Sequence, residues 1–156
     1  MIRVVALVAA ACLIFGVGGV LGAGGHLLNT AKDARTAIQA AAPQNCEKPD
    51  KVVDVSFSKT KYPHIMRHTN HALRQGWPSV LVLNRKGAAD RRDRATYGHP
   101  TKDGYNRDEY PPALGRRTWP ADVALVPDHE NKSHGSVMGI KLRRYCDGTK
   151  FRYVFY

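Results

Sequence analysis

The feature that most constrains this 156-residue chain is an uncharged run near its N-terminus. Residues 4–25, VVALVAAACLIFGVGGVLGAGG, carry no charged side chain and follow Arg3. A run of this length suffices to cross a bilayer, and it also fits the apolar region of a secretory signal peptide. We therefore predict a signal peptide or a membrane anchor over residues 1–28. With Arg3 on the cytoplasmic side, either one exports the rest of the chain.

The exported part is expected to hold one domain. Residues 29–45 are polar and rich in alanine, and we predict a linker there, with a helical stalk as the alternative. Residues 46–156 then form a compact domain of ordinary size. Cys46 and Cys146 bracket this domain, and in an oxidising compartment such a pair is expected to form a disulfide. Closing so long a loop contributes about 3–5 kcal/mol in the chain-entropy model.

The charge of the chain is strongly positive. Lys and Arg total 24 against 13 acidic residues, a net charge of +11. Three of these basic residues and one acid precede residue 45, which leaves +9 for the exported domain. Such a balance favours polyanionic partners such as nucleic acid, acidic membranes or wall polymers. The alternative is a soluble surface that is basic without a polyanionic partner.

The apolar pattern predicts an α+β domain. Pro63 and Gly76 mark the start and the end of the first predicted helix. The second helix is expected to end at Gly98. We expect strands over 52–58, 79–84, 107–110, 121–127 and 151–155, and helices over 62–76, 86–98 and 129–146. The buried side of the last helix is predicted to comprise Val137, Met138, Ile140, Leu142 and Tyr145.

Residues near the middle of the chain carry the groups that phosphodiester cleavage requires. The reaction needs a base for a water, positive charge at the phosphoryl and leaving oxygens, and a held substrate. Asp108 and Glu109 are candidate bases or metal ligands, and Glu130 is an oxygen ligand suited to Mg²⁺ or Mn²⁺. The candidate phosphate clamps are Arg91, Arg92 and Arg107.

Several blocks of the sequence together resemble one known family. GYNRDEYPPA, LVPDHENKSHGSVMG and YCDGTKFRYVF, with YPHIMRHTNHAL and LVLNRKGAADRRDRATYG upstream, resemble the NucA/NucB family of secreted bacterial deoxyribonucleases. The resemblance covers about residues 51–155. It implies a small ββα-metal-type nuclease domain, in which a strand, a loop, a second strand and a helix hold one divalent cation, Mg or Mn.

The resemblance also implies roles for single residues. Carried over by position, Asp108 is the general base and Glu130 the metal ligand. Glu109 would support the metal ligands or orient a neighbour, and Asn131 would cap the helix or contact the ion. Asn106 departs from the family, because some members have an additional Asp at this position.

Two histidines are further candidates. His134 lies one turn into the last helix, on the side of Glu130, and could donate a proton to the leaving oxygen or bind the metal. Many family members have Gln or a small residue at this position. His68, in the first helix, could bind phosphate or support a catalytic group. Placement of either histidine in the core or on the surface is the alternative.

Structural interpretations of the other candidates stay open as well. Asp108 and Glu109 can form salt bridges with nearby arginines. Glu130 can serve as an acidic residue at a helix N-terminus, and Asn131 as its cap. Arg91 and its neighbours can belong to a solvated helix face.

Together these observations predict an exported, sequence-nonspecific DNA endonuclease. We expect a monomer with one divalent cation and no small-molecule cofactor, secreted or anchored on the outer face of the cytoplasmic membrane. One alternative is a non-catalytic module that binds polyanions at the cell surface. Another is a nuclease toxin that acts on competitors.

Overall fold

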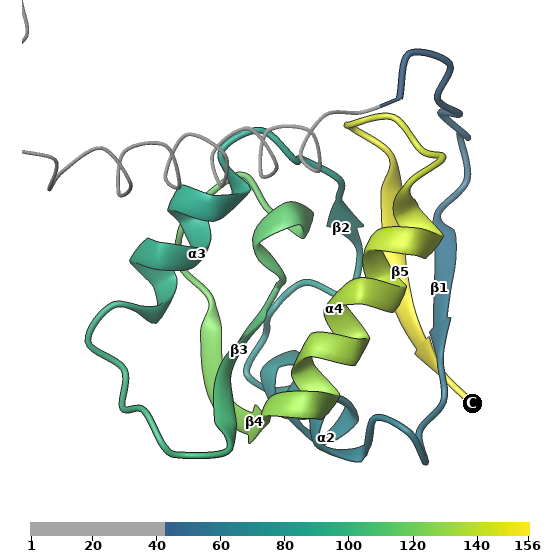
Figure 1. Ribbon diagram of the computed structural model, residues 1–156. Helices are drawn as coiled ribbons and strands as arrows, with labels where there is room; N and C mark the ends of the chain where they lie inside the picture. The colour runs from purple at the N-terminus through teal and green to yellow at the C-terminus, as the bar shows by residue number, and fades with distance from the viewer. Residues whose placement is uncertain (1–42) are drawn as a thin grey trace, which may run out of the picture. The chain divides into compact units, whose positions relative to one another are not determined.

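The computed structural model describes residues 43–156 (Figure 1). These residues form an α+β structure, as expected. The strands are β1 (Val53–Phe57), β2 (Leu81–Val82), β3 (Tyr105–Tyr110), β4 (Asp122–Pro127) and β5 (Lys150–Phe155). The helices are α2 (Pro63–Arg74), α3 (Ala88–Thr96) and α4 (Asp128–Leu142), with a 3₁₀ turn η1 (Ala113–Gly115).

The predicted signal peptide or anchor and nearly all of the predicted linker lie outside the described residues. Within residues 43–156, no helix is long and apolar enough to cross a membrane.

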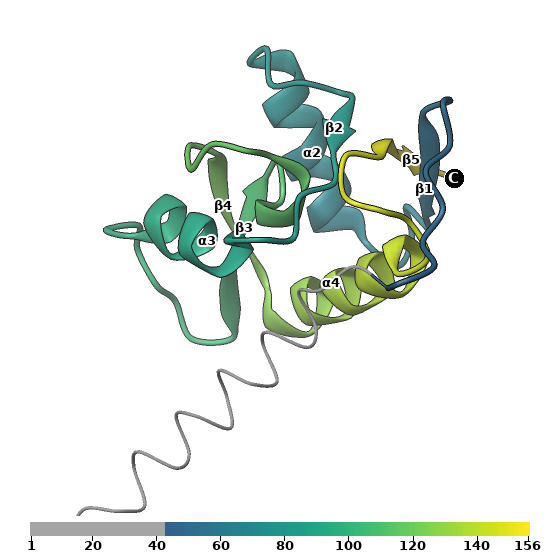
Figure 2. The same cartoon turned by 90° about the horizontal axis from the view of Figure 1, so that it is seen from above.

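The strands form two separate sheets. In the first, β5 is central and pairs parallel with β1 and antiparallel with β2. In the second, β3 and β4 form an antiparallel hairpin in which Asp108 lies opposite Ala124. Figures 1 and 2 show α3 on the outer side of this hairpin, away from β1 and β5. The hairpin and α4 follow one another in the chain, so they form a continuous β3–β4–α4 unit.

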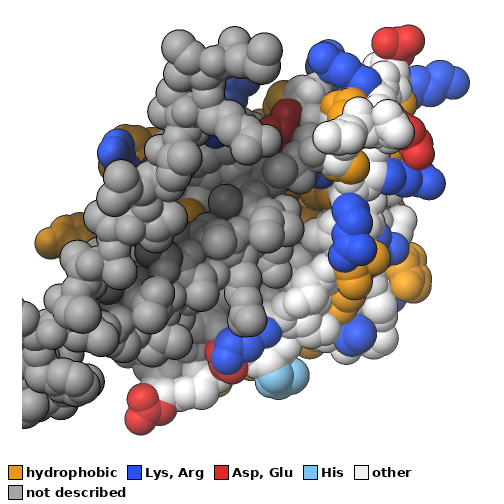
Figure 3. Space-filling model, turned by 45° about the horizontal axis from the view of Figure 1, so that its top comes forward, with side chains coloured by type: hydrophobic (Ala, Val, Ile, Leu, Met, Phe, Trp, Pro, Cys, Tyr) orange, Lys and Arg blue, Asp and Glu red, His pale blue; other side chains and the backbone are white. Residues whose placement is uncertain are grey.

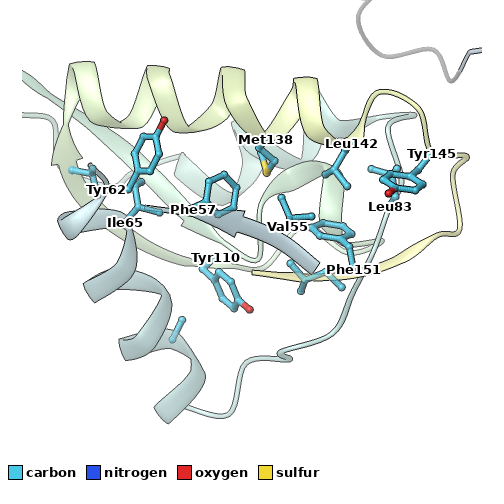
Figure 4. Packing of buried hydrophobic residues seen from close by; sticks show 13 residues of the cluster. Val55, Phe57, Tyr62, Ile65, Leu83, Tyr110, Met138, Leu142, Tyr145 and Phe151 are labelled. Carbon is cyan, nitrogen blue, oxygen red and sulfur yellow. The ribbon is translucent and has the colours of Figure 1, made fainter. Parts of the chain in front are cut away.

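The core lies between α4, α2 and the strands (Figure 4). Phe57 on β1 and Phe151 on β5 are 1% and 0% exposed, because the parallel pairing of these strands turns both rings to the helices. The other side chains that are at most 2% exposed include Val55, Ile65, Leu81, Leu83, Tyr110, Val126 and Leu142. The domain therefore has one contiguous apolar core under α4.

Helix α4 differs from its prediction at both ends and on its buried face. It begins at Asp128, and it ends at Leu142 because the chain turns to bring Cys146 next to residue 47. The buried positions on the helix are Glu130, His134, Met138 and Leu142, each four residues after the last. The prediction that Ile140 is buried is wrong. Ile140 is 62% exposed, since two residues rotate a helix by about 200° from Met138.

The predicted disulfide is confirmed. Cys46 and Cys146 are bonded across 100 residues of sequence. The backbone reinforces this link, because the N–H of Glu47 donates to Arg144 O and the N–H of Cys146 donates to Glu47 O. The entry of the described domain is thus joined to the segment between α4 and β5.

Of two further element predictions, the end of the first helix is confirmed and one strand needs adjustment. Helix α2 ends as expected before Gly76, which has φ of +88°, a conformation that suits glycine at a helix C-terminus. The strand expected over 79–84 shortens to Leu81–Val82. The N–H of Leu83 still donates to Thr149 O in the neighbouring segment, but Leu83 lies outside the β2–β5 strand pairing.

Candidate active site

Strand β3, the segment after it that includes η1, and helices α3 and α4 surround a pocket of about 240 Å³ that contains several predicted site residues. Residues of β3, the first turns of α4 and the start of α3 line it. Among the lining side chains are the predicted candidates Arg92, Asp108, Glu109, Asn131 and His134. The pocket is therefore the candidate active site.

Asp108 is held by a histidine. Its Oδ2 lies 2.7 Å from His68 Nδ1, and both side chains are mostly buried. The other oxygen, Oδ1, accepts no side-chain hydrogen bond from residues 43–156, so it is the part of the carboxylate left for a pocket ligand. This arrangement agrees with the role of a supporting group that the sequence suggested for His68.

Glu109 is engaged in a structural network. Its Oε2 lies 2.6 Å from Arg116 Nη2, and both side chains are about 95% buried. Its Oε1 lies 3.4 Å from Arg92 Nη1 and accepts from the N–H of Ala113 at 3.3 Å. The carboxylate is thus neutralised by two arginines and joins β3 to η1 and α3. This matches the salt-bridge interpretation of Glu109 rather than the catalytic one.

His134 is buried and has an unsatisfied ring nitrogen. It packs among Phe57, Tyr62 and Tyr153, and its Nε2 has no hydrogen-bond partner in residues 43–156. Burial lowers the pKa of His134 to about 4, although the charges of Asp108 and Glu130 oppose this shift. The ring is therefore neutral at pH 7, which favours a ligand or acceptor role over that of a proton donor to a leaving group.

Glu130 closes the N-terminus of α2. Its Oε1 accepts from the N–H groups of His64 and Ile65 at 2.7 and 3.0 Å, and its Oε2 lies 2.7 Å from His64 Nδ1. Tyr62, the N-cap residue of α2, makes no side-chain cap bond. The carboxylate of Glu130, from α4, accepts hydrogen bonds from the N–H groups at this helix N-terminus instead. After these contacts a single lone pair remains, on Oε2, for any other ligand.

Asn131 does not cap α4. The helix begins three residues earlier, and its N-cap residue, Pro127, makes no side-chain cap bond. Asn131 instead lines the pocket with Asp108 and His134. The predicted capping role is wrong, and the predicted contact with an ion is compatible with this position.

The three candidate arginines have different surroundings. Arg91 donates to the carbonyl oxygens of Asn84, Lys86 and Ala113 and so fixes the α3 region. Arg107 donates to O of Thr96, the last residue of α3, at 2.7 Å. These contacts oppose the prediction that both are phosphate clamps. Arg92 lines the pocket with a side chain that is 45% exposed, and it is the candidate best placed to meet a phosphate.

Asn106 has a clear partner in this chain. Its Nδ2 donates to Asp128 Oδ1, which ties β3 to the first residue of α4. An Asp at position 106 would place two carboxylates against each other. The departure from the family at this position therefore fits its local surroundings.

Three important residues were not among the sequence candidates. Arg116, 6% exposed, pairs with Glu109, His64 pairs with Glu130, and Asp122 lies 3.4 Å from the Nε2 of His68. The sequence held a weak signal for the first, since an arginine seven residues after an acid can return to it across a Pro-Pro turn. It held none for the other two, because their partners are 66 and 54 residues away in sequence.

Comparison with known proteins identifies a homologue of this chain. No protein-family model matches it. A stretch of 97 residues, 62% of the chain, is 34% identical to the DNA-entry nuclease of Bacillus subtilis (strain 168). The chain is a homologue of this NucA-type nuclease. The relationship that the motifs indicated is thereby confirmed.

The homologous stretch spans 66% of the DNA-entry nuclease, slightly less than two thirds of its length. What the name of that nuclease says about DNA therefore enters as a proposal for this chain.

Proposed function

We propose that this homologue of the DNA-entry nuclease is an exported endonuclease that hydrolyses DNA without sequence preference, using a divalent cation. The observation that carries the proposal is Asp108, which lines a pocket with one oxygen held by His68 and the other free. Residues 46–156 form the proposed nuclease domain, acting as a monomer. The Cys46–Cys146 disulfide supports export, since such bonds persist in oxidising compartments.

The order of the elements supports a ββα-metal-type nuclease fold. Strand β3 carries Asp108, strand β4 returns beside it, and α4 brings Asn131 and His134 to the same pocket. This is the strand, strand and helix order that the resemblance implies. The hairpin register fixes where Asp108 lies relative to the helix.

The donors in the pocket fit a hard cation that keeps several of its waters. Within residues 43–156, no group of three or more His, Cys, Asp or Glu side chains is arranged to hold a metal ion. Mg²⁺, however, is commonly bound through one or two carboxylates with water completing its shell. The buried, unpartnered Nε2 of His134 indicates that a polar partner belongs in this pocket. Asn131, which lines the pocket, and Glu130 through Oε2, which does not line it, are the proposed ligands, so Asp108 Oδ1 stays free to act as the base.

Three residues of the chain have distinct roles in the proposed mechanism. Asp108 Oδ1 takes the proton from a water, whose oxygen attacks the phosphorus while the P–O3′ bond breaks, and the departing O3′ takes a proton from solvent water. His68 holds the other oxygen of Asp108 and so orients the carboxylate. Arg92 donates to the phosphoryl oxygens. When bound, the cation stabilises the charge on the phosphoryl and leaving oxygens.

The basic surface supports recruitment of DNA. Lys and Arg side chains are spread over the described part of the face shown in Figure 3, with Asp and Glu side chains among them. Contacts between such side chains and phosphates are sequence-independent and weaken steeply with salt. Binding of this kind agrees with cutting that has no sequence preference.

The test of the proposed function is plasmid nicking by the purified chain. We expect nicking with Mg²⁺ or Mn²⁺, none with EDTA, and recovery when the metal is restored. The same protein should bind DNA less tightly as salt rises. DNA binding without metal-dependent nicking would instead favour the non-catalytic polyanion-binding module.

Substitutions of Glu130 separate its two roles. Glu130→Ala should lower the free energy of unfolding in EDTA by about 1–3 kcal/mol, because the N-terminus of α2 loses its buried acceptor. Glu130→Gln keeps one oxygen for the two N–H groups, so its loss of stability should be smaller. If Glu130 is also a ligand, Glu130→Gln will need at least about tenfold more Mg²⁺ for half-maximal nicking.

Glu47→Gln is the matched control, since the side chain of Glu47 is exposed and its ion pair among residues 43–156 is with Arg144 at 3.9 Å. Unfolding in urea and a Mg²⁺ titration of nicking give the two measurements. A Glu130→Gln protein that nicks at wild-type Mg²⁺ concentrations would leave Glu130 with the structural role alone.

A further inference from the structure

A second hollow, of about 340 Å³, lies between α2 and β4. Residues 122–126 of β4 line one side, and His64, Arg67, His68 and His71 line the other. Asp108 lines only the first pocket, whereas His68 and Asp122 line only the second. His68 therefore lies between the proposed catalytic carboxylate and a second carboxylate that faces another hollow.

The hairpin register explains why the two carboxylates flank one imidazole. Asp108 lies opposite Ala124, and Asp122 lies opposite Tyr110. Paired residues of an antiparallel hairpin share a face, and residues two apart on one strand also do. Asp108 and Asp122 are therefore diagonal neighbours on the face that α2 covers. His68 projects from α2 between them.

The ring of His68 meets a carboxylate at each nitrogen. Nδ1 is 2.7 Å from Asp108 Oδ2, and Nε2 is 3.4 Å from Asp122 Oδ2. Nε2 and Asp122 Oδ2 are both buried, and neither has a hydrogen-bond partner in residues 43–156, so their 3.4 Å contact is an ion-pair distance and not a formed hydrogen bond. His71 Nε2 is farther from the same oxygen, at 4.0 Å, and its side chain is 56% exposed. Asp122 thus supplies the nearest acceptor on the Nε2 side of the ring.

We propose that Asp122 is a positioning residue for the nuclease site. It holds the Nε2 edge of His68, so that Nδ1 stays directed at Asp108 Oδ2 and Asp108 Oδ1 stays directed at the first pocket. A carboxylate behind a functional histidine commonly fixes the orientation of the ring in this way. The inference rests on the proposed function and extends it to a residue on β4 that does not line the pocket.

A double-mutant cycle on the full chain tests this inference. Asp122→Ala should lower kcat for plasmid nicking by about 10–100-fold, with the DNA dissociation constant within about twofold of wild type. Because Asp122 acts through His68, adding Asp122→Ala to a His68→Ala protein should change kcat by less than about twofold. The matched control is Asp54→Ala, whose carboxylate pairs with Arg152 on the surface and should leave kcat unchanged.

Nuclear magnetic resonance gives a readout that does not need activity. Asp122→Ala should shift the ring ¹⁵N signals of His68 and the ¹³Cγ signal of Asp108, and Asp54→Ala should not. Asp122→Asn, which keeps an oxygen near Nε2 and serves if the alanine protein does not fold, should shift these signals less. It should also lose less than about tenfold in kcat.

Three results would overturn the inference: wild-type kcat in Asp122→Ala, additive losses in the double mutant, or unchanged His68 signals. A wild-type chain that cuts no DNA would refute the proposed function instead. The resonance shifts would then still decide whether Asp122 controls His68 and, through it, Asp108.

Discussion

Replacing Asp108 by Asn is expected to lower kcat for plasmid nicking by about 10³-fold or more. Asparagine has nearly the same shape, and its oxygen can still face His68 Nδ1, but it cannot take a proton from water. General bases contribute about 10²–10⁴-fold to such reactions. The effect on kcat should therefore be larger than that of any other single substitution considered for this chain.

DNA binding should respond in the opposite direction. Removing a negative charge from a pocket in a protein of net charge +11 should leave the DNA dissociation constant unchanged or lower it. The control is Asp103→Asn, an exposed acid in the loop before β3 that makes the same change of charge. An Asp108→Asn protein that nicks DNA like wild type would remove the base from the mechanism, whatever the homology.

The strand alternation explains why Asp108 and Glu109 differ so much. Neighbouring residues on a strand project to opposite faces. On β3 this directs Asp108 to His68 on α2 and Glu109 to Arg116 and Arg92 near η1 and α3. The sequence identified the acidic pair as important, and the alternation alone could have shown that the two acids have different partners. It could not have named those partners, which come from elements 40, 17 and 7 residues away.

Local patterns predicted most elements, and long-range contacts decided the exceptions. The boundaries of α2 followed from Pro63 and Gly76, which act through the backbone of their own segment. The end of α4 depends on the disulfide between Cys146 and Cys46 across the domain. This long-range bond does not change the helical periodicity of the sequence, so the periodicity could not predict where the helix ends. Glu130 likewise looked like an acid of its own helix, whereas it serves the N-terminus of another.

The second large effect is expected at Arg116. Arg116→Met should lower the free energy of unfolding by about 3–5 kcal/mol, because it leaves Glu109 as a buried carboxylate without its closest cation. Arg92 remains, but at 3.4 Å and from a half-exposed position it compensates little. The carbonyl oxygens of Pro111, Thr118 and Arg91 also lose their donor. Arg117→Met, at the exposed neighbouring position, is the control in urea unfolding.

The double substitution Glu109→Gln with Arg116→Met should recover part of this loss, since no buried charge is then left unpaired. Glu109→Gln alone should reduce stability while the molecules that remain folded keep kcat within about tenfold of wild type. The reason is that both oxygens of Glu109 already have partners within the scaffold. A Glu109→Gln protein with wild-type stability and a kcat as low as that of Asp108→Asn would instead assign Glu109 to the chemistry, and the two acids of β3 would then act as a catalytic pair.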